Sequence, residues 1–387
     1  MHPIFNVKLV YMYLRLYKYI KSQSFFIYGP RGVGKSNWVK NHFNKGPYID
    51  LLRAQTFNEL SANPSRLEEL IPPGSEWVVI DEVQKLPSLL DEVHRLIENK
   101  KIKFVLTGSS ARKLRKQGVN LLAGRALTTY MHPLTVQELR SDFNLKKSLT
   151  IGHLPMAYTS KDPQEYLHSY VKTFLKEEIL QEGIIRNLEG FSRFLEAASF
   201  SQGQYLNISK VAGDAHIDRK AIEGYFRILE DLLVAVRLPV FQKKAKRKST
   251  KHPKFFFFDV GIYRTLRPTG PLDAPEEIAG PALETLVFQE LRALNDYFKW
   301  KFDFYCWSVS QGPDVDLVLY GPKGIIAIEI KHSSRLRGGE LDGLRAFKQE
   351  YKMAKLLYIY GGKEKRFIDG IEVVPIEEFL KSSSHYF

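Results

Sequence analysis

The segment Phe25-Phe26-Ile27-Tyr28-Gly29-Pro30-Arg31-Gly32-Val33-Gly34-Lys35-Ser36 decides the fold of the N-terminal part of this chain. An apolar run, which predicts a strand, enters a glycine-rich turn that ends in Lys-Ser at the start of a predicted helix over 36–43. Glycines permit backbone conformations and close approaches that a Cβ atom would block, so such a loop can surround a phosphate with its N–H groups. The segment therefore predicts a phosphate-binding loop between a strand and a helix.

Two side chains and one helix end complete this predicted site. The Lys35 ammonium can reach the β and γ phosphates of a nucleotide, and the Ser36 hydroxyl can bind Mg²⁺. The N-terminus of the following helix adds partial positive charge. The residues expected to surround the nucleotide are Gly29, Pro30, Arg31, Gly32, Val33, Gly34, Lys35 and Ser36. Their spacing matches the pattern G-x-x-x-x-G-K-[ST], and a nucleoside triphosphate with Mg²⁺ is the expected ligand.

A second apolar run, Trp77-Val78-Val79-Ile80-Asp81-Glu82, predicts a buried strand of a parallel sheet that ends in two acidic residues. A carboxylate at the end of such a strand, beside a phosphate loop, can hold Mg²⁺ through water, and a second one can polarise the attacking water. We therefore assign Asp81 to the metal and Glu82 to the role of general base. Without the phosphate loop upstream, a solvated turn would be the better interpretation.

Further candidates follow the strand predicted over 103–107. The hydroxyls of Thr107 and Ser109 would lie near the γ phosphate, where a polar side chain can sense hydrolysis. Capping of the following helix by Ser109 or Ser110 explains the same residues equally well. Arg125 can reach a phosphate in its own site or, in a homo-oligomer, in the site of a neighbour.

In this order, the motifs resemble the bacterial and archaeal AAA-type ATPases that carry a C-terminal domain of uncharacterised function. The matching segments are 29–36, Val79-Ile80-Asp81-Glu82-Val83-Gln84-Lys85-Leu86-Pro87, Leu106-Thr107-Gly108-Ser109-Ser110, Ala123-Gly124-Arg125 and His132-Pro133-Leu134. The resemblance covers nearly the whole chain and implies an ATPase that uses ATP and Mg²⁺. The residues that it places in the ATPase site are Lys35, Ser36, Asp81, Glu82 and Ser109. An arginine in the Ala-Gly-Arg segment is usual in that family, and Arg125 matches it, but the resemblance leaves its role open.

The middle of the chain predicts a winged helix-turn-helix. Two short helices with a tight turn, over 208–212 and 217–233, are followed by strands over 234–241 and 255–258. Asp218 is placed to cap the second helix. Because winged helices contact either DNA or proteins, both a DNA partner and a protein partner are open at this point.

The segment between those two strands is strongly basic and contains no acidic residue. Its cations are Lys243, Lys244, Lys246, Arg247, Lys248, Lys251 and Lys254. On a wing, such a cluster would lie along DNA phosphates and bind in a sequence-tolerant, salt-sensitive way. A solvated loop is the alternative interpretation.

The last third of the chain holds a second predicted chemistry in a hairpin over 313–331. Side chains two apart on a strand share a face, so Glu329 and Lys331 project together, and Asp316 joins them from the adjoining strand. Two carboxylates can hold Mg²⁺ against a phosphodiester while the lysine positions or activates water. This group resembles the PD-(D/E)xK nuclease fold, which would place metal ligands at Asp316 and Glu329, and Glu284 near one end of a preceding helix. An ion pair of Glu329 with Lys331 in an inactive scaffold is the alternative.

Length and motif order together predict an α/β protein of three domains. The expected domains are a P-loop NTPase domain with a parallel sheet over 1–140, a helical linker with a winged helix over 141–253, and a restriction-endonuclease-like α/β domain over 254–387. The net charge of +14 favours a polyanionic partner such as nucleic acid, although an anionic membrane surface would also attract it.

The cellular setting is predicted to be cytoplasmic. Cys306 is the only cysteine of the chain, which excludes an intramolecular disulfide framework and favours a reducing compartment. The first residues, 1–19, lack a small-residue cleavage site for secretion, and the segment 7–20 predicts an amphipathic helix instead. No apolar run is long enough to cross a bilayer.

Two functions fit these features. The first is an ATP-driven, DNA-associated enzyme in which hydrolysis controls engagement of the winged helix or cleavage near Asp316. The second is a nucleotide-dependent switch that binds a protein partner and uses an inactive nuclease-like domain for recognition.

Overall fold

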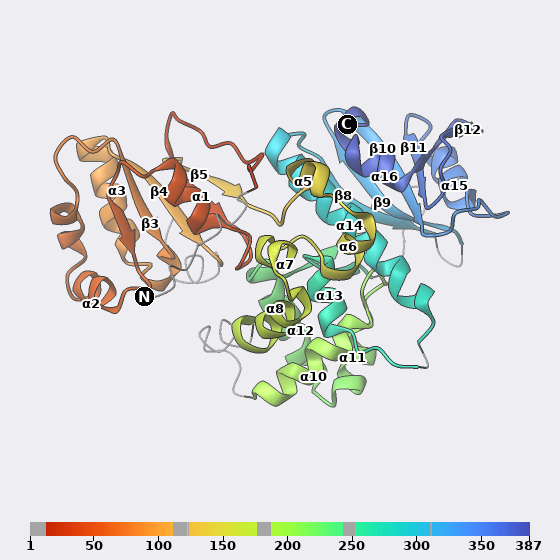
Figure 1. The fold of residues 1–387 in the computed structure, drawn as a ribbon, viewed down its shortest axis with the longest axis horizontal. Helices are drawn as coiled ribbons and strands as arrows, with labels where there is room; N and C mark the ends of the chain where they lie inside the picture. Colours follow the sequence, from red (N-terminus) through yellow and green to blue (C-terminus); the bar gives the residue numbers. More distant parts are fainter. Residues whose placement is uncertain are drawn as a thin grey trace, which may run out of the picture.

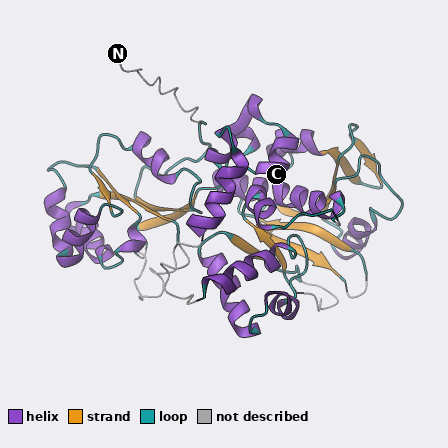
Figure 2. Ribbon diagram, turned by 60° about the horizontal axis from the view of Figure 1, so that its bottom comes forward, coloured by secondary structure: helices purple, strands orange, loops and turns teal. Residues whose placement is uncertain are grey.

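The computed structural model describes residues 13–110, 122, 124–175, 187–242, 252–271, 273–309 and 312–387. Figure 1 shows the chain passing from an N-terminal sheet at one end of the long axis, through a group of helices, to a second sheet at the other end. Figure 2 shows the same two sheets as separate layers with helices between them.

The N-terminal unit is a five-stranded, fully parallel sheet in the order β2-β3-β4-β1-β5. Its strands are β1 (Ser24–Tyr28), β2 (Tyr48–Asp50), β3 (Trp77–Asp81), β4 (Lys103–Gly108) and β5 (Ala126–Tyr130). Its helical segments are α1 (Lys35–His42), α2 (Ala54–Ala62), η1 (Pro64–Leu70), η2 (Val83–Lys85) and α3 (Leu89–Lys100). The parallel sheet and mixed α/β character agree with the predicted fold class.

The apolar run before the phosphate loop explains why β1 is a central strand. Phe25 and Ile27 join one hydrophobic cluster, and Phe26 and Tyr28 join the cluster on the other face. Side chains alternate between the two faces of a strand, so a continuous apolar run fits only a strand that is covered on both sides. This burial fixes the strand after which the glycine-rich loop begins.

The helix predicted over 7–20 is wrong for the residues that the structure describes. Residues 13–20 form no helix, and residues 7–12 lie outside the described part of the chain. This segment instead packs Tyr17 against Trp38, with the two ring centroids 4.7 Å apart in an edge-to-face arrangement. These long-range contacts outweigh the local amphipathic pattern.

The middle unit is mainly helical and contains a two-stranded sheet. Its elements are α5 (Val136–Leu139), η3 (Arg140–Asp142), α6 (Leu145–Ile151), α7 (Pro155–Thr159), α8 (Pro163–Ser169), η4 (Tyr170–Leu175), α10 (Leu188–Ser199), α11 (Ile208–Ala215), α12 (Arg219–Asp231), β6 (Ala235–Leu238), β7 (Lys254–Phe257) and α13 (Val260–Leu266). Asp218 caps α12 as predicted, because its Oδ1 accepts the N–H of Lys220 at 2.8 Å. Strands β6 and β7 pair with each other, so the predicted division at residue 253 falls between two partners of one sheet.

The C-terminal unit contains a six-stranded mixed sheet in the order β12-β13-β11-β10-β9-β8. Its elements are α14 (Pro275–Phe298), β8 (Asp303–Ser308), β9 (Asp314–Gly321), β10 (Gly324–Lys331), α15 (Asp342–Glu350), β11 (Lys355–Tyr360), β12 (Arg366–Ile368), β13 (Ile371–Pro375), α16 (Ile376–Lys381) and η5 (Ser383–His385). Strands β9 and β10 form the predicted antiparallel hairpin.

Helix α14 connects the C-terminal unit with the strand ends of the N-terminal sheet. Glu290 accepts the backbone N–H of Val136 at 2.9 Å, and the Tyr297 hydroxyl accepts the backbone N–H of His132 at 3.0 Å. The same helix packs against α6, α13 and β10. In the described ranges, no helix is both long and apolar enough to cross a membrane.

Candidate nucleotide-binding site and C-terminal charge cluster

The loop between β1 and α1 requires glycine at two positions for different reasons. A Cβ atom on Gly29 would lie only 2.2 Å from the Met131 carbonyl oxygen, so a larger residue would push β1 away from the chain that follows β5. Gly34, which precedes α1, has φ 98°, a left-handed conformation that L side chains rarely adopt. The predicted strand, loop and helix therefore form in the order that a phosphate cradle needs.

Lys35 is held inside this loop. Its Nζ donates to the carbonyl oxygens of Gly29 at 2.6 Å and Pro30 at 3.0 Å, and the residue is only 5% exposed. The ammonium is thus positioned within the turn by backbone oxygens. A bound phosphate would offer it a charged acceptor at the same place.

Asp81 lies beside Ser36, as the phosphate-loop prediction requires. The Ser36 hydroxyl donates to Asp81 Oδ1 at 3.1 Å, and Asp81 is 2% exposed at the end of β3. The Tyr48 hydroxyl and the Thr107 hydroxyl also donate to this carboxylate. A serine hydroxyl and a carboxylate so close together are oxygen donors of the kind that Mg²⁺ prefers, so these residues fit the implied metal.

Glu82, Gln84 and Ser109 form a second polar group beside Asp81. Gln84 Nε2 donates to Ser109 Oγ at 3.1 Å and also to the Glu82 carboxylate, and the Glu82 backbone N–H donates to Thr107 Oγ1 at 3.1 Å. The predicted base and the predicted sensor are therefore bridged by one amide. Sequence reasoning did not assign Gln84, although its place two residues after Glu82 was the available signal. The alternative of a helix cap at Ser109 or Ser110 involves residues beyond 110, which lie outside the described part.

Arg125 is not brought to this group within one chain. It precedes β5, whose Ala126 pairs with Ser24 at the start of β1, whereas the phosphate loop follows the other end of β1. The length of that strand, about 13 Å, separates the two ends. Arg125 instead forms an ion pair with Glu98 of α3.

Arg15 is a residue of this site that sequence reasoning missed. Its guanidinium donates to the Val33 carbonyl oxygen in the loop at 2.6 Å and to the His132 carbonyl oxygen at 2.6 Å. It also contacts Glu138 Oε1 at 3.0 Å and the Tyr297 hydroxyl at 3.0 Å. One buried side chain thus joins the loop, the chain after β5 and helix α14, and no local pattern marks it.

A cavity of about 290 Å³ opens beside the loop. Its lining residues come from the N-terminal segment, from the loop and α1, and from the middle of the chain: Tyr13, Leu14, Arg15, Gly34, Asn37, Trp38, Asn41, His42, Leu134, Pro155, Met156 and Thr159. The middle unit also contacts the loop directly, because the Tyr170 hydroxyl donates to the Arg31 carbonyl oxygen at 2.9 Å.

The hairpin of β9 and β10 brings the three predicted C-terminal residues together. Asp316 Oδ2 accepts the backbone N–H of Ile330 at 2.9 Å, and Lys331 Nζ contacts Glu329 Oε1 at 2.5 Å. Asp316 and Glu329 are buried, whereas the Lys331 side chain is 37% exposed. Glu284 also faces this cluster, but it lies in the middle of α14 rather than near a helix end, because the helix begins nine residues earlier than Glu284, at Pro275.

Lys254 belongs to this cluster and not to a solvent-facing wing, so its assignment to the basic segment is wrong. Its Nζ lies 2.7 Å from Asp316 Oδ1 and 3.8 Å from Glu284 Oε2, and the residue is 4% exposed. The other cations of the segment, at 243–251, lie outside the described residues. The available signal was a lysine directly before the buried run of phenylalanines in β7, where a solvent-facing side chain is not expected.

The buried charges shift one another's proton affinities. Burial and the neighbouring Asp316 raise the pKa of Glu284 to about 8, and the same two causes raise the pKa of Glu329. Burial opposes ionisation of Asp316, but the Lys254 and Lys331 ammonium groups and the hydrogen bonds from Lys254 and the Ile330 N–H together outweigh it and lower the pKa of Asp316. Among the described residues, no group of three or more His, Cys, Asp or Glu side chains is arranged to hold a metal ion.

Comparison with known proteins supports the N-terminal assignment. Residues 21–140 match the family model described as AAA domain, so the N-terminal region is AAA-type ATPase-like. Residues 142–273 and 279–379 match two further models, each described as a domain of unknown function, DUF8612 and DUF4143.

The individual relatives carry no functional description. The chain is similar to Uncharacterized protein Rv2008c of Mycobacterium tuberculosis, with 24% identity over 92% of this chain and 80% of the relative. It is also similar to Uncharacterized protein MJ1544 of Methanocaldococcus jannaschii, with 23% identity over 92% and 88%. Among solved structures, the crystal structure of protein VC1899 from Vibrio cholerae aligns over 94% of this chain and 96% of that one, at 10% identity and a TM-score of 0.23.

Proposed function

We propose that this protein binds ATP at the loop between β1 and α1 and hydrolyses it with Mg²⁺. The observation that carries the proposal is the contact of 3.1 Å between Ser36 Oγ and Asp81 Oδ1, because it places the end of β3 against the first turn of the phosphate-loop helix. The AAA-type character of residues 21–140 supports the same conclusion.

Each residue has a defined task in this proposal. The loop N–H groups and the Lys35 ammonium bind the β and γ phosphates, and Ser36 with Asp81 would hold Mg²⁺. When bound, the metal neutralises charge on the transferred phosphoryl group. Glu82 orients the attacking water, and Gln84 connects Glu82 with Ser109 so that loss of the γ phosphate is sensed by both. The cavity beside Gly34 is the place proposed for the base and ribose.

ATP turnover by the purified protein tests this proposal. Lys35→Ala should abolish hydrolysis while the protein remains folded, because the β and γ phosphates would keep the loop N–H groups but lose the charged side chain proposed to bind them. The matched control is Lys40→Ala, since Lys40 is exposed on the same helix. Normal turnover by the Lys35 variant, or equal loss in both variants, would refute the assignment.

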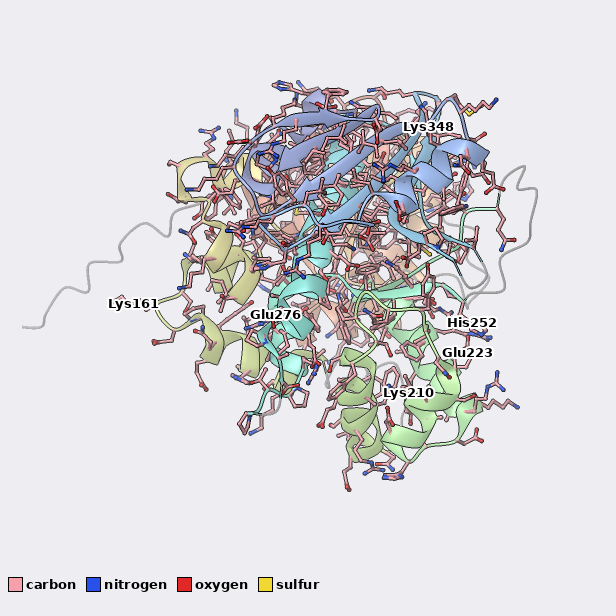
Figure 3. The ribbon with its side chains drawn as sticks, turned by 90° about the vertical axis from the view of Figure 1, so that its right-hand side faces the viewer. Lys161, Lys210, Glu223, His252, Glu276 and Lys348 are labelled. Atoms are coloured by element: carbon pink, nitrogen blue, oxygen red, sulfur yellow. The ribbon has the colours of Figure 1, made fainter. Side chains whose placement is uncertain are left out.

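We further propose that the middle unit contacts DNA through α11 and α12. The exposed side chains of Lys210, Arg219, Lys220 and Arg227 give these helices basic surface. DNA retardation at low salt is expected to weaken in Lys210→Glu and to remain in Lys161→Glu, a charge-matched control. Figure 3 shows Lys161 and Lys210 on opposite sides of the molecule in that view. Equal effects of the two variants would show that only net charge matters.

A protein partner is the alternative to DNA at this surface, and it is favoured if neither variant alters retardation. A homo-oligomer would allow Arg125 to serve a neighbouring site, which its distance from its own loop prevents. A cytoplasmic setting remains part of this proposal.

Metal-dependent DNA cleavage is a second candidate for the C-terminal unit. It is favoured because β9 and β10 bring the buried Asp316 and Glu329 together with the partly exposed Lys331. If the purified protein nicks DNA with Mg²⁺ while Asp316→Asn does so equally well, this site is not responsible. The alternative is an inactive recognition domain, and it is favoured if the position of the metal ion beside Asp316 and Glu329 is taken by another cation.

A further inference from the structure

We propose that the Lys254 ammonium occupies the cation position of the C-terminal carboxylate cluster and competes there with a divalent metal ion. The candidate nuclease site is therefore masked by a side chain of the chain itself. This inference does not depend on the ATPase proposal, since it concerns a different unit.

The geometry around Lys254 Nζ supports this role. The ammonium lies 2.7 Å from Asp316 Oδ1, the carboxylate predicted to hold the metal, and 3.8 Å from Glu284 Oε2. The Tyr205 ring lies over it, with the centroid 5.7 Å from Nζ. The Lys254 ammonium thus lies between two carboxyl groups and an aromatic face and is shielded from solvent. Electrostatic attraction to these groups stabilises it in this position.

The backbone of Lys254 is fixed on both sides. Lys254 pairs with Leu238 of β6 on one side and forms an antiparallel bridge with Tyr205 on the other. The Leu206 N–H also donates to the Pro253 carbonyl oxygen at 2.8 Å. The ammonium can therefore leave Asp316 only by rotation of its own side chain, and a divalent ion arriving at Asp316 would meet its positive charge.

The carboxylates nevertheless retain unused binding capacity. Glu284 Oε2 and Glu329 Oε2 are buried and have no hydrogen-bond partner among the residues that the structure describes. Three carboxylates, those of Glu284, Asp316 and Glu329, face two ammonium groups, those of Lys254 and Lys331. Removal of the Lys254 ammonium would leave the Asp316 carboxylate and the oxygen atoms of Glu284 and Glu329 where a hard cation could bind.

Mn²⁺ binding to the full chain without nucleotide, measured by electron paramagnetic resonance, tests the proposal. The wild type is expected to bind no more Mn²⁺ than Asp316→Asn does. Lys254→Met should bind at least about tenfold more tightly than the wild type, because a unit charge beside the ion is removed. Adding Asp316→Asn to Lys254→Met should abolish the gain, and the exposed control Lys210→Met should show none.

The double variant Lys254→Met/Glu284→Gln covers the case in which Lys254→Met does not fold. It replaces Lys254 and the neighbouring Glu284 carboxyl group with neutral side chains, while Asp316 and Glu329 remain as oxygen donors. Tighter Mn²⁺ binding that depends on Asp316 in either folded variant supports the proposal. Mn²⁺ binding by the wild type that depends on Asp316 and equals that of the variant overturns it, and so does the absence of any gain.

Discussion

Replacement of Arg15 by methionine should destabilise the protein by about 4 kcal/mol, because it leaves the Glu138 charge buried and breaks several contacts at once. Glu138 is fully buried and loses its ion pair with Arg15, although the N–H groups of Leu16 and Thr135 still bind it at 2.6 and 2.9 Å. The Val33 and His132 carbonyl oxygens lose a charged donor as well.

A double-mutant cycle separates these contributions. Arg15→Met/Glu138→Gln removes the uncompensated charge, so it should recover about 2 kcal/mol relative to Arg15→Met. The control Arg193→Met breaks a solvent-exposed ion pair with Glu189 and should cost below about 1 kcal/mol. Urea unfolding followed by tryptophan fluorescence and far-ultraviolet circular dichroism measures each free energy, and coincident transitions justify a two-state treatment.

The same variant should also weaken ATP binding. Arg15 fixes the Val33 carbonyl group inside the loop, so the loop loses part of its preorganised shape. The KM for ATP should therefore rise in both Arg15 variants, including the double variant in which stability is partly recovered. A stability loss below about 1 kcal/mol, or a double variant no more stable than Arg15→Met, would contradict the proposed role of the buried pair.

Three further predictions concern stability and the loop. Burial lowers the pKa of His153 from 6.5 to about 4. The contribution of the neutral imidazole to stability is therefore complete above pH 6.5 and is lost as the pH falls towards 4. Between these values the wild type should lose about 3 kcal/mol more unfolding free energy than His153→Gln. An equal pH dependence of the two proteins would contradict this. Asp218→Ala should lower the unfolding free energy by about 1 kcal/mol in the same urea assay, because the first turn of α12 loses its cap. An unchanged urea midpoint would show that the cap does not contribute to stability. Gly29→Ala should abolish binding of a fluorescent ATP analogue, since its Cβ would collide with the Met131 carbonyl oxygen, and retained binding would show that β1 and the chain after β5 can separate.

The predicted features that the structure reproduces are those determined by residues close together in the sequence. The apolar run of β1, the glycines after it and the Lys35-Ser36 pair act on neighbouring backbone, and strand alternation decides which side chains share a face. The hairpin of β9 and β10 follows the same logic, because Glu329 and Lys331 are two residues apart. The Asp218 cap needs only the N–H groups of Lys220 and Ala221, two and three residues later. Local periodicity and turn chemistry were sufficient for all of these.

Tertiary structure decided the features whose partners are far apart in the chain. From the sequence, Lys254 is interpreted as one more cation of a basic segment. In the structure, pairing of β7 with β6 places it against Asp316, 62 residues later. Arg15 lies in a segment whose local pattern predicted a helix, yet residues 13–20 form none, and its contact with Tyr297 spans 282 residues. A buried charge is stable only where opposite charges and hydrogen-bond partners surround it, and those partners are assembled by packing of distant elements rather than by sequence spacing.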